Sequence, residues 1–188
     1  YRAGAHTARE TRAAGIPWTF SPVCDVARQP LWSRVYETFG EDPRLAAIMA
    51  SASVRGYQGT DPASMDRVAA CMKHFAGYSM PLSGQDRTPA WIPERQLREY
   101  FLPPFQAAVD AGALTAMINS SSINGVPVHA DPFMLDQVLR REMGFRGLAV
   151  TDWEDVRNLV RAHHVAKDYE EATYLAVTAG VDMCMEPM

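Results

Sequence analysis

Short runs of consecutive apolar residues alternate along this chain with longer segments in which apolar residues recur every three or four positions. The continuous runs are typical of strands buried on both faces, and the periodic segments are typical of amphipathic helices. Five runs are predicted to be strands, at residues 18–26, 68–75, 114–120, 148–151 and 181–185. Four segments are predicted to be helices, at residues 43–56, 93–111, 132–143 and 170–179.

The second of these helices contains two consecutive prolines, Pro103-Pro104. Proline has no backbone N–H and its ring collides with the preceding turn, so it interrupts a helix interior. We therefore expect a kink there, or two separate helices. The chain also begins in what looks like a helix.

Strands that alternate with helix-length connections indicate a parallel sheet, either a doubly wound open sheet or a barrel. A glycine-rich phosphate loop does not follow the first predicted strand, which weakens the dinucleotide-binding version of the open sheet. Polar residues follow almost every strand, and side chains that converge from many strand ends are typical of a barrel. Five strands cannot close a barrel of about 250 residues. We therefore predict a partial (β/α)8 TIM barrel that lacks its first strands and its last strand.

The fourth predicted strand runs directly into a carboxylate and an aromatic residue, Asp152-Trp153. A buried, unpaired carboxylate is costly, so Asp152 must be paired, neutral or directed toward a polar pocket. The carboxyl ends of parallel strands form the ligand sites of barrels, which makes Asp152 the first candidate for catalysis. The alternative is that Asp152 caps the following helix, with Glu154 and Asp155 in its first turn.

Lys73 and His74 end the second predicted strand. Adjacent residues of a regular strand face opposite sides of the sheet, so both can reach one ligand only if the backbone is irregular there. We expect such an irregularity between Lys73 and Phe75, and a non-proline cis peptide is one form that it can take. A buried lysine needs a reason, whereas a lone histidine is more often a satisfied core residue.

Arg34 follows the first predicted strand and precedes Glu37 by three residues. An ion pair between them would orient the guanidinium so that it could bind two neighbouring hydroxyls of a ligand, although a plain surface ion pair is the alternative. Trp153 could offer an aromatic face to a sugar ring and Met117 an apolar wall; taken alone, each is more often a packing residue.

Composition narrows the function classes. The chain has 188 residues, a formal net charge of -4 and no basic run, so we predict no nucleic-acid partner. No apolar run approaches the roughly 20 residues that cross a membrane, so we predict no membrane partner. The three cysteines are an odd number without short spacing, which argues against a disulfide framework and a zinc site. We predict neither a metal nor an organic cofactor.

Two enzyme chemistries fit these residues. A carboxylate nucleophile, Asp152, among ligands for sugar hydroxyls would make a retaining glycosidase. A strand-end lysine, Lys73, could instead form a Schiff base as in an aldolase. A degenerate barrel that binds sugar without catalysis is a third alternative, which the presence of Asp152, Arg34, Lys73 and His74 counts against.

Several segments, in order along the chain, resemble motifs of the glycoside hydrolase family 3 β-glucosidases. The resemblance covers almost everything from Trp18 to Met185. Its motifs are Phe20-Ser21-Pro22-Val23, then Arg34 with Glu37-Thr38-Phe39-Gly40-Glu41-Asp42-Pro43, Lys73-His74-Phe75-Ala76-Gly77, Ser122-Ile123-Asn124-Gly125, Gly144-Phe145-Arg146-Gly147, Thr151-Asp152-Trp153 and Ala179-Gly180-Val181-Asp182-Met183.

The resemblance implies that residues 1–188 are a fragment of the family's N-terminal barrel domain. It implies a retaining, exo-acting β-glucosidase that hydrolyses terminal non-reducing β-D-glucosyl residues of a small-molecule or oligosaccharide substrate. Asp152 matches the catalytic nucleophile. The substrate-binding positions are matched by Arg34, Lys73, His74, Met117 and Trp153.

The resemblance also points outside the chain. In the family the acid/base glutamate lies in a C-terminal α/β sandwich domain, which this sequence does not contain, and a further substrate-binding aspartate precedes the position of Tyr1. Family members favour an extracellular or periplasmic location. Ser120 stands where the family often has an aromatic residue, and Lys73-His74-Phe75-Ala76-Gly77-Tyr78 resembles the β-glucosidase branch rather than the N-acetylglucosaminidase branch.

Overall fold

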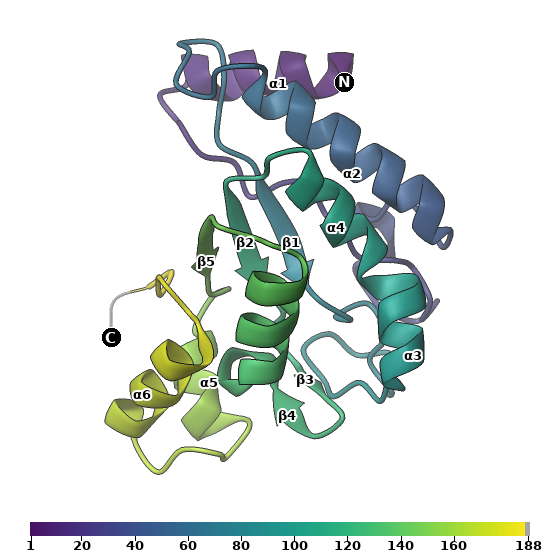
Figure 1. Ribbon diagram of the computed structural model, residues 1–188. Helices are drawn as coiled ribbons and strands as arrows, with labels where there is room; N and C mark the ends of the chain where they lie inside the picture. Colours follow the sequence, from purple (N-terminus) through teal and green to yellow (C-terminus); the bar gives the residue numbers. More distant parts are fainter. Residues whose placement is uncertain (187–188) are drawn as a thin grey trace.

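The computed structural model describes residues 1–186 and has a small parallel sheet at its centre (Figure 1). Strands β1 (Cys71–Phe75), β2 (Thr115–Ile118) and β5 (Leu148–Val150) lie in the order β1-β2-β5, and both neighbouring pairs are parallel. Thr115 lies opposite Cys71 on one side and Leu148 on the other. The second, third and fourth predicted strands are therefore confirmed as neighbours in a parallel sheet, each shorter than predicted.

The first and fifth predicted strands are not continuous strands, and in this respect the prediction was wrong. They follow the two edges of the sheet through isolated parallel bridges: Val23 pairs with Lys73 beside β1, and Met183 pairs with Val150 beside β5. On the first edge, Pro22 has no N–H to donate to a ladder. The sheet thus extends past its three strands in both directions, as expected of the predicted partial (β/α)8 barrel.

Two predicted helices form with almost the predicted bounds. These are α2 (Pro43–Gln58) and α6 (Tyr169–Ala179). Each begins after an aspartate whose carboxylate accepts hydrogen bonds from backbone N–H groups of the first turn, Asp42 for α2 and Asp168 for α6. Such caps satisfy donors that have no partner inside the helix, which is why the helices begin at these residues.

The double proline divides the next predicted helix, as expected. The segment consists of α3 (Glu94–Gln96), the π-helical turn η2 (Leu97–Phe101) and α4 (Pro103–Asp110). Leu102 donates its backbone N–H to the carbonyl of Leu97, five residues earlier, at 3.0 Å. The wider turn lets the chain continue in the same direction although the prolines donate no hydrogen bonds.

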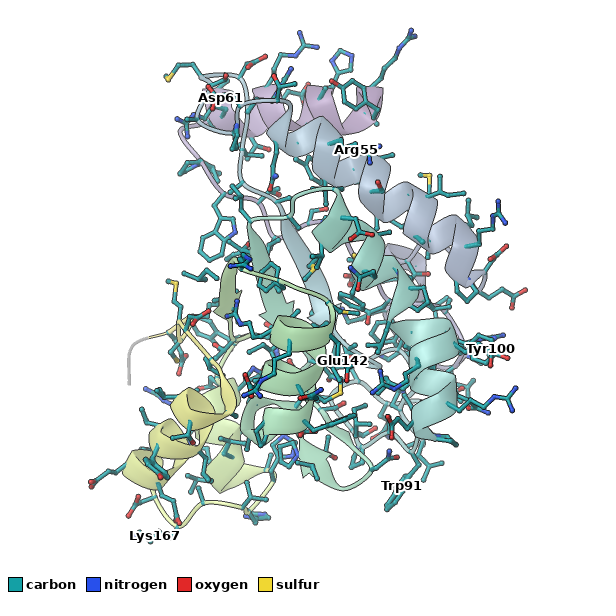
Figure 2. The ribbon with its side chains drawn as sticks, viewed as in Figure 1. Arg55, Asp61, Trp91, Tyr100, Glu142 and Lys167 are labelled. Atoms are coloured by element: carbon teal, nitrogen blue, oxygen red, sulfur yellow. The ribbon has the colours of Figure 1, made fainter. Side chains whose placement is uncertain are left out.

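The third predicted helix is η4 (Phe133–Glu142), which is π-helical along its length. Residue Arg98 of η2 donates to the carboxylate of Glu142 at 2.6 Å and joins the two π-helical segments (Figure 2). The apolar periodicity correctly placed this helix, but it did not distinguish π-helical from α-helical hydrogen bonding.

Several short elements complete the described part of the chain. Asn124 and Gly125, with φ of 51° and 89°, form the turn of a β-hairpin, as Asn-Gly pairs often do. Within residues 1–186, no helix is both long and apolar enough to cross a membrane. The helix expected at the start of the chain is α1 (Arg2–Ala13), and the elements outside the predicted set are η1 (Val35–Glu37), β3 (Ser122–Ile123), β4 (Val126–Pro127), η3 (Val128–Ala130) and α5 (Asp155–Arg161).

Side chains of the sheet alternate between two faces, since successive strand residues point in opposite directions. The helix-covered face carries residues that belong to the large apolar core shared with α2, α4 and η4, namely Met72, Ala116 and Ala149. The inner face carries a separate small group, Cys71, Met117 and Val150. In Figure 1 the arrows of β1 and β2 point away from α1, so α1 lies toward the amino ends of the strands.

Candidate active site

The carboxyl ends of the strands bring together polar residues that are distant in sequence. Asp152 follows β5, and its side chain is 15% exposed. Its Oδ1 accepts the backbone N–H of Trp153 at 2.7 Å, and its Oδ2 accepts the hydroxyl of Ser120 at 3.3 Å. The Nε2 atom of His74 lies 3.8 Å from Oδ2. Asp152 therefore lies at the centre of the polar strand ends.

Asp152 does not cap the following helix. Glu154 occupies the cap position of α5, with a left-handed φ of 61° and no capping hydrogen bond from its side chain. The helix itself begins at Asp155. The Asp152 carboxylate is therefore available to a ligand.

The charges around Asp152 favour its ionised form. Burial alone would raise the pKa of Asp152, but the Trp153 N–H and the positive charges of His74, Arg87 and Arg34 outweigh burial and lower the pKa below its usual range. A carboxylate that stays ionised in a partly buried position is suited to act as a nucleophile.

His74 is held from behind by a second buried carboxylate. Asp25 Oδ2 accepts both the backbone N–H of His74, at 3.0 Å, and its ring Nδ1–H, at 2.9 Å. The two side chains are 1% and 0% exposed. Asp25 thereby fixes the imidazole ring, with Nε2 directed toward Asp152.

The backbone at Lys73 and His74 is irregular, as predicted. The Lys73–His74 and Phe75–Ala76 peptide bonds are cis, and the register between β1 and β2 shifts between Met72 and Phe75.

Lys73 and His74 both influence the carboxylate of Glu37 electrostatically. Hydrogen bonds from Arg34 lower the pKa of Glu37 most, and the charges of Lys73 and His74 lower it further. Arg34 donates to both oxygens of Glu37 through Nε and Nη2, each at 2.8 Å, in the arrangement expected from their spacing. The guanidinium also lies over the ring of Tyr78, 5.6 Å from its centroid. Arg34, Lys73, His74 and Asp152 thus form one constellation from three separate segments.

The other two predicted site residues differ in exposure. Trp153 is 56% exposed, and its indole is free to contact a ligand. Met117 is 2% exposed and packs with Cys71 and Val150 on the inner face. Met117 lies opposite Val150, and Val150 precedes Asp152 by two residues. Met117 therefore contributes to the packing beneath the polar strand ends.

Arg87 is part of this site and had no signal in the sequence beyond its place in a long polar loop. Its Nη1 donates to the backbone carbonyl of Trp153 at 2.9 Å and to Asp155 Oδ1 at 3.1 Å, and its Nη2 lies 3.4 Å from Asp152 Oδ1. These partners are more than sixty residues away along the chain.

Behind Arg87 lies a fully buried acid and base. Asp155 and His129 are 1% and 3% exposed, and their nearest side-chain atoms are 3.5 Å apart. Burial raises the pKa of Asp155 to about 7 and lowers the pKa of His129 to about 3, since each charged form loses its hydration. Neither residue was among the predicted site residues, because both belong to segments outside the predicted strands.

A bound metal has no obvious place here. Among residues 1–186, no three histidine, cysteine, aspartate or glutamate side chains are arranged to hold a metal ion. The groups at the strand ends are instead donors and acceptors of the kind that bind hydroxyls: a guanidinium, an ammonium, an imidazole and a carboxylate.

The comparisons with known proteins agree with this geometry. Residues 1–188 match the "Glycosyl hydrolase family 3 N terminal domain". The chain is 53% identical over 188 residues to the lysosomal beta glucosidase of Dictyostelium discoideum and 42% identical over 183 residues to a beta-xylosidase of Formosa agariphila. These alignments cover 97% and 95% of this chain but only 23% and 25% of the relatives.

Solved structures give the same picture. A β-glucosidase involved in saponin metabolism from intestinal bacteria superposes with a TM-score of 0.94 at 43% identity, over 98% of this chain and 25% of that one. The β-glucosidase of Listeria innocua in complex with glucose gives a TM-score of 0.94 at 35% identity, over 98% and 26%. The predicted partial barrel is thereby confirmed, and this chain, which spans about a quarter of the length of these relatives, belongs to glycosyl hydrolase family 3.

Proposed function

We propose that this chain carries the nucleophile and the sugar-binding residues of a retaining, exo-acting β-glucosidase. The observation that supports the proposal most is the ionised Asp152 at a strand end, beside His74 and close to Arg34. The relatives' names agree with glycosidase chemistry, and the similarity to a β-glucosidase at 53% identity favours glucose over xylose.

In the proposed reaction an oxygen of Asp152 attacks the anomeric carbon while the bond to the leaving oxygen breaks, and a covalent glycosyl-enzyme results. An acid gives its proton to the leaving oxygen. The same group then acts as a base on the water that releases the sugar, with net retention of configuration. The chain's own part in this sequence is to hold the sugar and to present an ionised carboxylate.

The acid/base carboxylate is proposed to come from outside the described residues. Asp155 has a raised pKa, but its side chain is 1% exposed and does not reach a substrate oxygen. Glu37 is bound through both oxygens to Arg34 and its pKa is lowered, which makes it a poor proton donor. A C-terminal domain of the full-length protein, as in the family resemblance, is the proposed source.

Arg34, Lys73 and His74 are proposed to bind the hydroxyls of the terminal glucose. A guanidinium, an ammonium and an imidazole discriminate between sugars by the positions of their hydroxyls, because an unmatched buried polar group costs free energy. Trp153 is proposed to pack its exposed ring against the sugar.

The test is covalent trapping in the full-length protein with a fluoroglucoside that has an activated leaving group. We expect one sugar per protein, attached to Asp152, and no labelling of the Asp152→Ala variant. Attachment to another residue would refute the assignment. Failure to trap any adduct, together with retained glucose binding, would favour the alternative of a sugar-binding barrel without catalysis.

The Schiff-base alternative is tested separately. If Lys73 only binds hydroxyls, borohydride in the presence of a carbonyl substrate leaves Lys73 unmodified. A reduced adduct on Lys73 would reverse the proposal in favour of an aldolase.

A further inference from the structure

Arg87 contacts three groups that together define the position of Asp152. One nitrogen, Nη1, donates to the Trp153 carbonyl and to Asp155 Oδ1, while Nη2 lies 3.4 Å from Asp152 Oδ1. Asp152 and Trp153 lie in the turn after β5, and Asp155 is the first residue of α5. One guanidinium therefore holds both sides of the turn that carries the proposed nucleophile.

The loop that supplies Arg87 is itself anchored to the same side of the molecule. Trp32 donates its indole N–H to Asp86 at 2.8 Å, and Gln29 donates to the carbonyl of Pro81 at 3.2 Å. Arg87 has a left-handed φ of 58°, a conformation that non-glycine residues seldom adopt without support from their surroundings. The Arg87 side chain is 35% exposed, so it reaches from the buried Asp155 toward the protein surface.

Asp155 provides the buried anchor for this arginine. Its Oδ1 accepts from Arg87, and its Oδ2 has no hydrogen-bond partner among residues 1–186. Two carboxylates three residues apart, Asp152 and Asp155, would repel each other in this partly buried place without a cation between them. Because a guanidinium is planar with donors on two sides, it can bind both carboxylates at once, which an ammonium cannot do with equal geometry.

We propose that Arg87 is a positioning residue for Asp152: it holds Oδ1 and the Trp153 carbonyl, and it leaves Oδ2 as the oxygen directed at the sugar. Oδ2 faces the hydroxyl of Ser120 and Nε2 of His74 at 3.3 and 3.8 Å, both longer than the 2.7 Å bond that Oδ1 accepts from the Trp153 N–H. This inference rests on the proposed role of Asp152 as nucleophile.

The charges that face Arg87 and Asp152 come from several elements, and all bear on the pH dependence of the site. Arg87 faces Asp152 and Asp155 of the β5–α5 turn, Tyr78 and Asp86. Asp152 additionally faces His74 at the end of β1 and Arg34 of the loop before η1. The pKa of His129 in η3 is raised by the charge of Asp152 and lowered by the charge of Arg87.

The test compares three variants of the full-length protein: Arg87→Met, Arg87→Lys and, as a matched control, Arg95→Met. Arg95 is a fully solvated arginine whose side chain is 90% exposed. We expect Arg87→Met to lower kcat about 100-fold with little change in KM, because a nucleophile displaced by a fraction of an ångström loses much of its advantage. We expect Arg95→Met to match the wild type.

The pH profile separates positioning from simple loss of structure. Without Arg87, one charge that favours ionised Asp152 is gone, so the acidic limb of kcat/KM moves to higher pH in Arg87→Met. Arg87→Lys keeps the charge and loses the two-sided geometry, so its acidic limb stays near that of the wild type while kcat remains reduced. If Arg87→Met does not fold, Arg87→Lys tests the proposal by itself, through a reduced kcat with an unmoved acidic limb.

Two results would overturn the proposal. One is a raised KM at unchanged kcat in both Arg87 variants, which would make Arg87 a substrate ligand. The other is a loss of activity that only parallels the loss of folded protein, with an unmoved acidic limb. Trapping with the fluoroglucoside keeps the two hypotheses apart. If the wild type is labelled at Asp152 and Arg87→Met is labelled at the same rate, the positioning role of Arg87 is refuted while the nucleophile stands. If the wild type is not labelled, the proposed nucleophile is refuted and this inference falls with it.

Discussion

The two faces of the β1–β2–β5 sheet differ in how much apolar surface they bury. On the helix-covered face, Met72, Ala116 and Ala149 belong to a continuous core that extends through α2, α4 and η4. On the inner face, Cys71, Met117 and Val150 form only a small apolar group, and the carboxylates and cations of the site lie near the carboxyl ends of these strands.

The contrast teaches where stability and chemistry are located. Burying apolar side chains stabilises a fold, at about 25 cal/mol for each Å² removed from water. Burying carboxylates and cations costs free energy, which their mutual pairing only offsets in part. We therefore expect substitutions on the helix-covered face to act on folding, and substitutions at the polar strand ends to act on rate.

The largest expected effect is at Asp152. In the full-length protein, Asp152→Asn should lower kcat by several orders of magnitude, because the amide cannot form the glycosyl-enzyme. The thermal midpoint should stay equal or fall slightly, since the lowered pKa of Asp152 means that its ionised form contributes to stability near neutral pH. Asp136→Asn, at an exposed position of η4, is the control for the change of aspartate to asparagine. A stable, fully active Asp152→Asn variant would contradict the assignment.

On the opposite face the effect should be on stability. Phe105 is 1% exposed and packs edge-on against Phe75, with ring centroids 5.3 Å apart. Phe105→Ala should lower the free energy of unfolding by about 3–5 kcal/mol, as for other buried phenylalanines. Urea unfolding measures this loss, and Phe133→Ala, at a position 40% exposed, should lose far less. Unchanged kcat for the folded fraction of Phe105→Ala would support the division between the two faces.

A smaller loss of activity is expected when Lys73, at the polar strand ends, is replaced. We expect Lys73→Met to lose roughly 2–4 kcal/mol of transition-state binding, the effect of removing a charged hydrogen bond from a buried site. The measurement is kcat/KM of the full-length protein on an aryl β-glucoside. Lys167→Met is the control, because that side chain is 77% exposed and lies far from the sheet (Figure 2). Equal kcat/KM for both variants would remove Lys73 from the site.

The buried pair Asp155 and His129 gives stability a predictable pH dependence. The folded pKa of Asp155, about 7, lies above its usual 3.8, so its contribution is lost as pH rises from 4 to 7. The folded pKa of His129, about 3, lies below its usual 6.5, so its contribution is lost as pH falls from 6.5 to 3. Between pH 4 and 6.5 the two slopes oppose each other.

Removing one partner should expose the slope of the other. In Asp155→Asn the free energy of unfolding should rise with pH between 3 and 6.5, and in His129→Gln it should fall between pH 4 and 7. Each slope is limited to about 1.4 kcal/mol per pH unit for a single proton. Urea unfolding at half-unit pH steps measures both. Two variants with slopes of the same sign would contradict the opposed titrations.

The smallest effect is expected at Met117. Because it is buried on the inner face, Met117→Leu should cost less than about 1.5 kcal/mol of stability and change kcat/KM only slightly. A stable variant with a large loss of activity would mean that Met117 contacts the sugar directly.

Sequence patterns predicted the helix-covered face better than the polar site. Buried runs such as the one ending at Val150 are readable because a parallel strand is apolar on both faces. The π-helical form of η4 was not readable, because the apolar residues alone do not show whether each N–H bonds to the fourth or the fifth preceding carbonyl. The first and fifth predicted strands form only isolated bridges. In the first run, Pro22 cannot donate a hydrogen bond to a ladder.

At the site, residues in apolar runs or in family motifs were predicted, and residues outside them were not. Arg34, Lys73, His74 and Asp152 follow apolar runs or a family motif, so their positions were marked. Arg87 follows nothing of the kind, and its partners become neighbours only after the chain folds. Asp25 lies in the first predicted run, but nothing in the sequence marks its contact with His74, 49 residues away.

The way in which Asp25 holds His74 also sets the direction of a hydrogen bond. With Nδ1–H committed to Asp25, only Nε2 is left for a sugar hydroxyl. A neutral ring accepts at Nε2, so it requires the hydroxyl to donate; a protonated ring donates, so it requires the hydroxyl to accept. A substrate in which fluorine replaces that hydroxyl can accept weakly but cannot donate. The penalty for this replacement, compared with the penalty for hydrogen in its place, therefore reports which proton arrangement of His74 the enzyme uses.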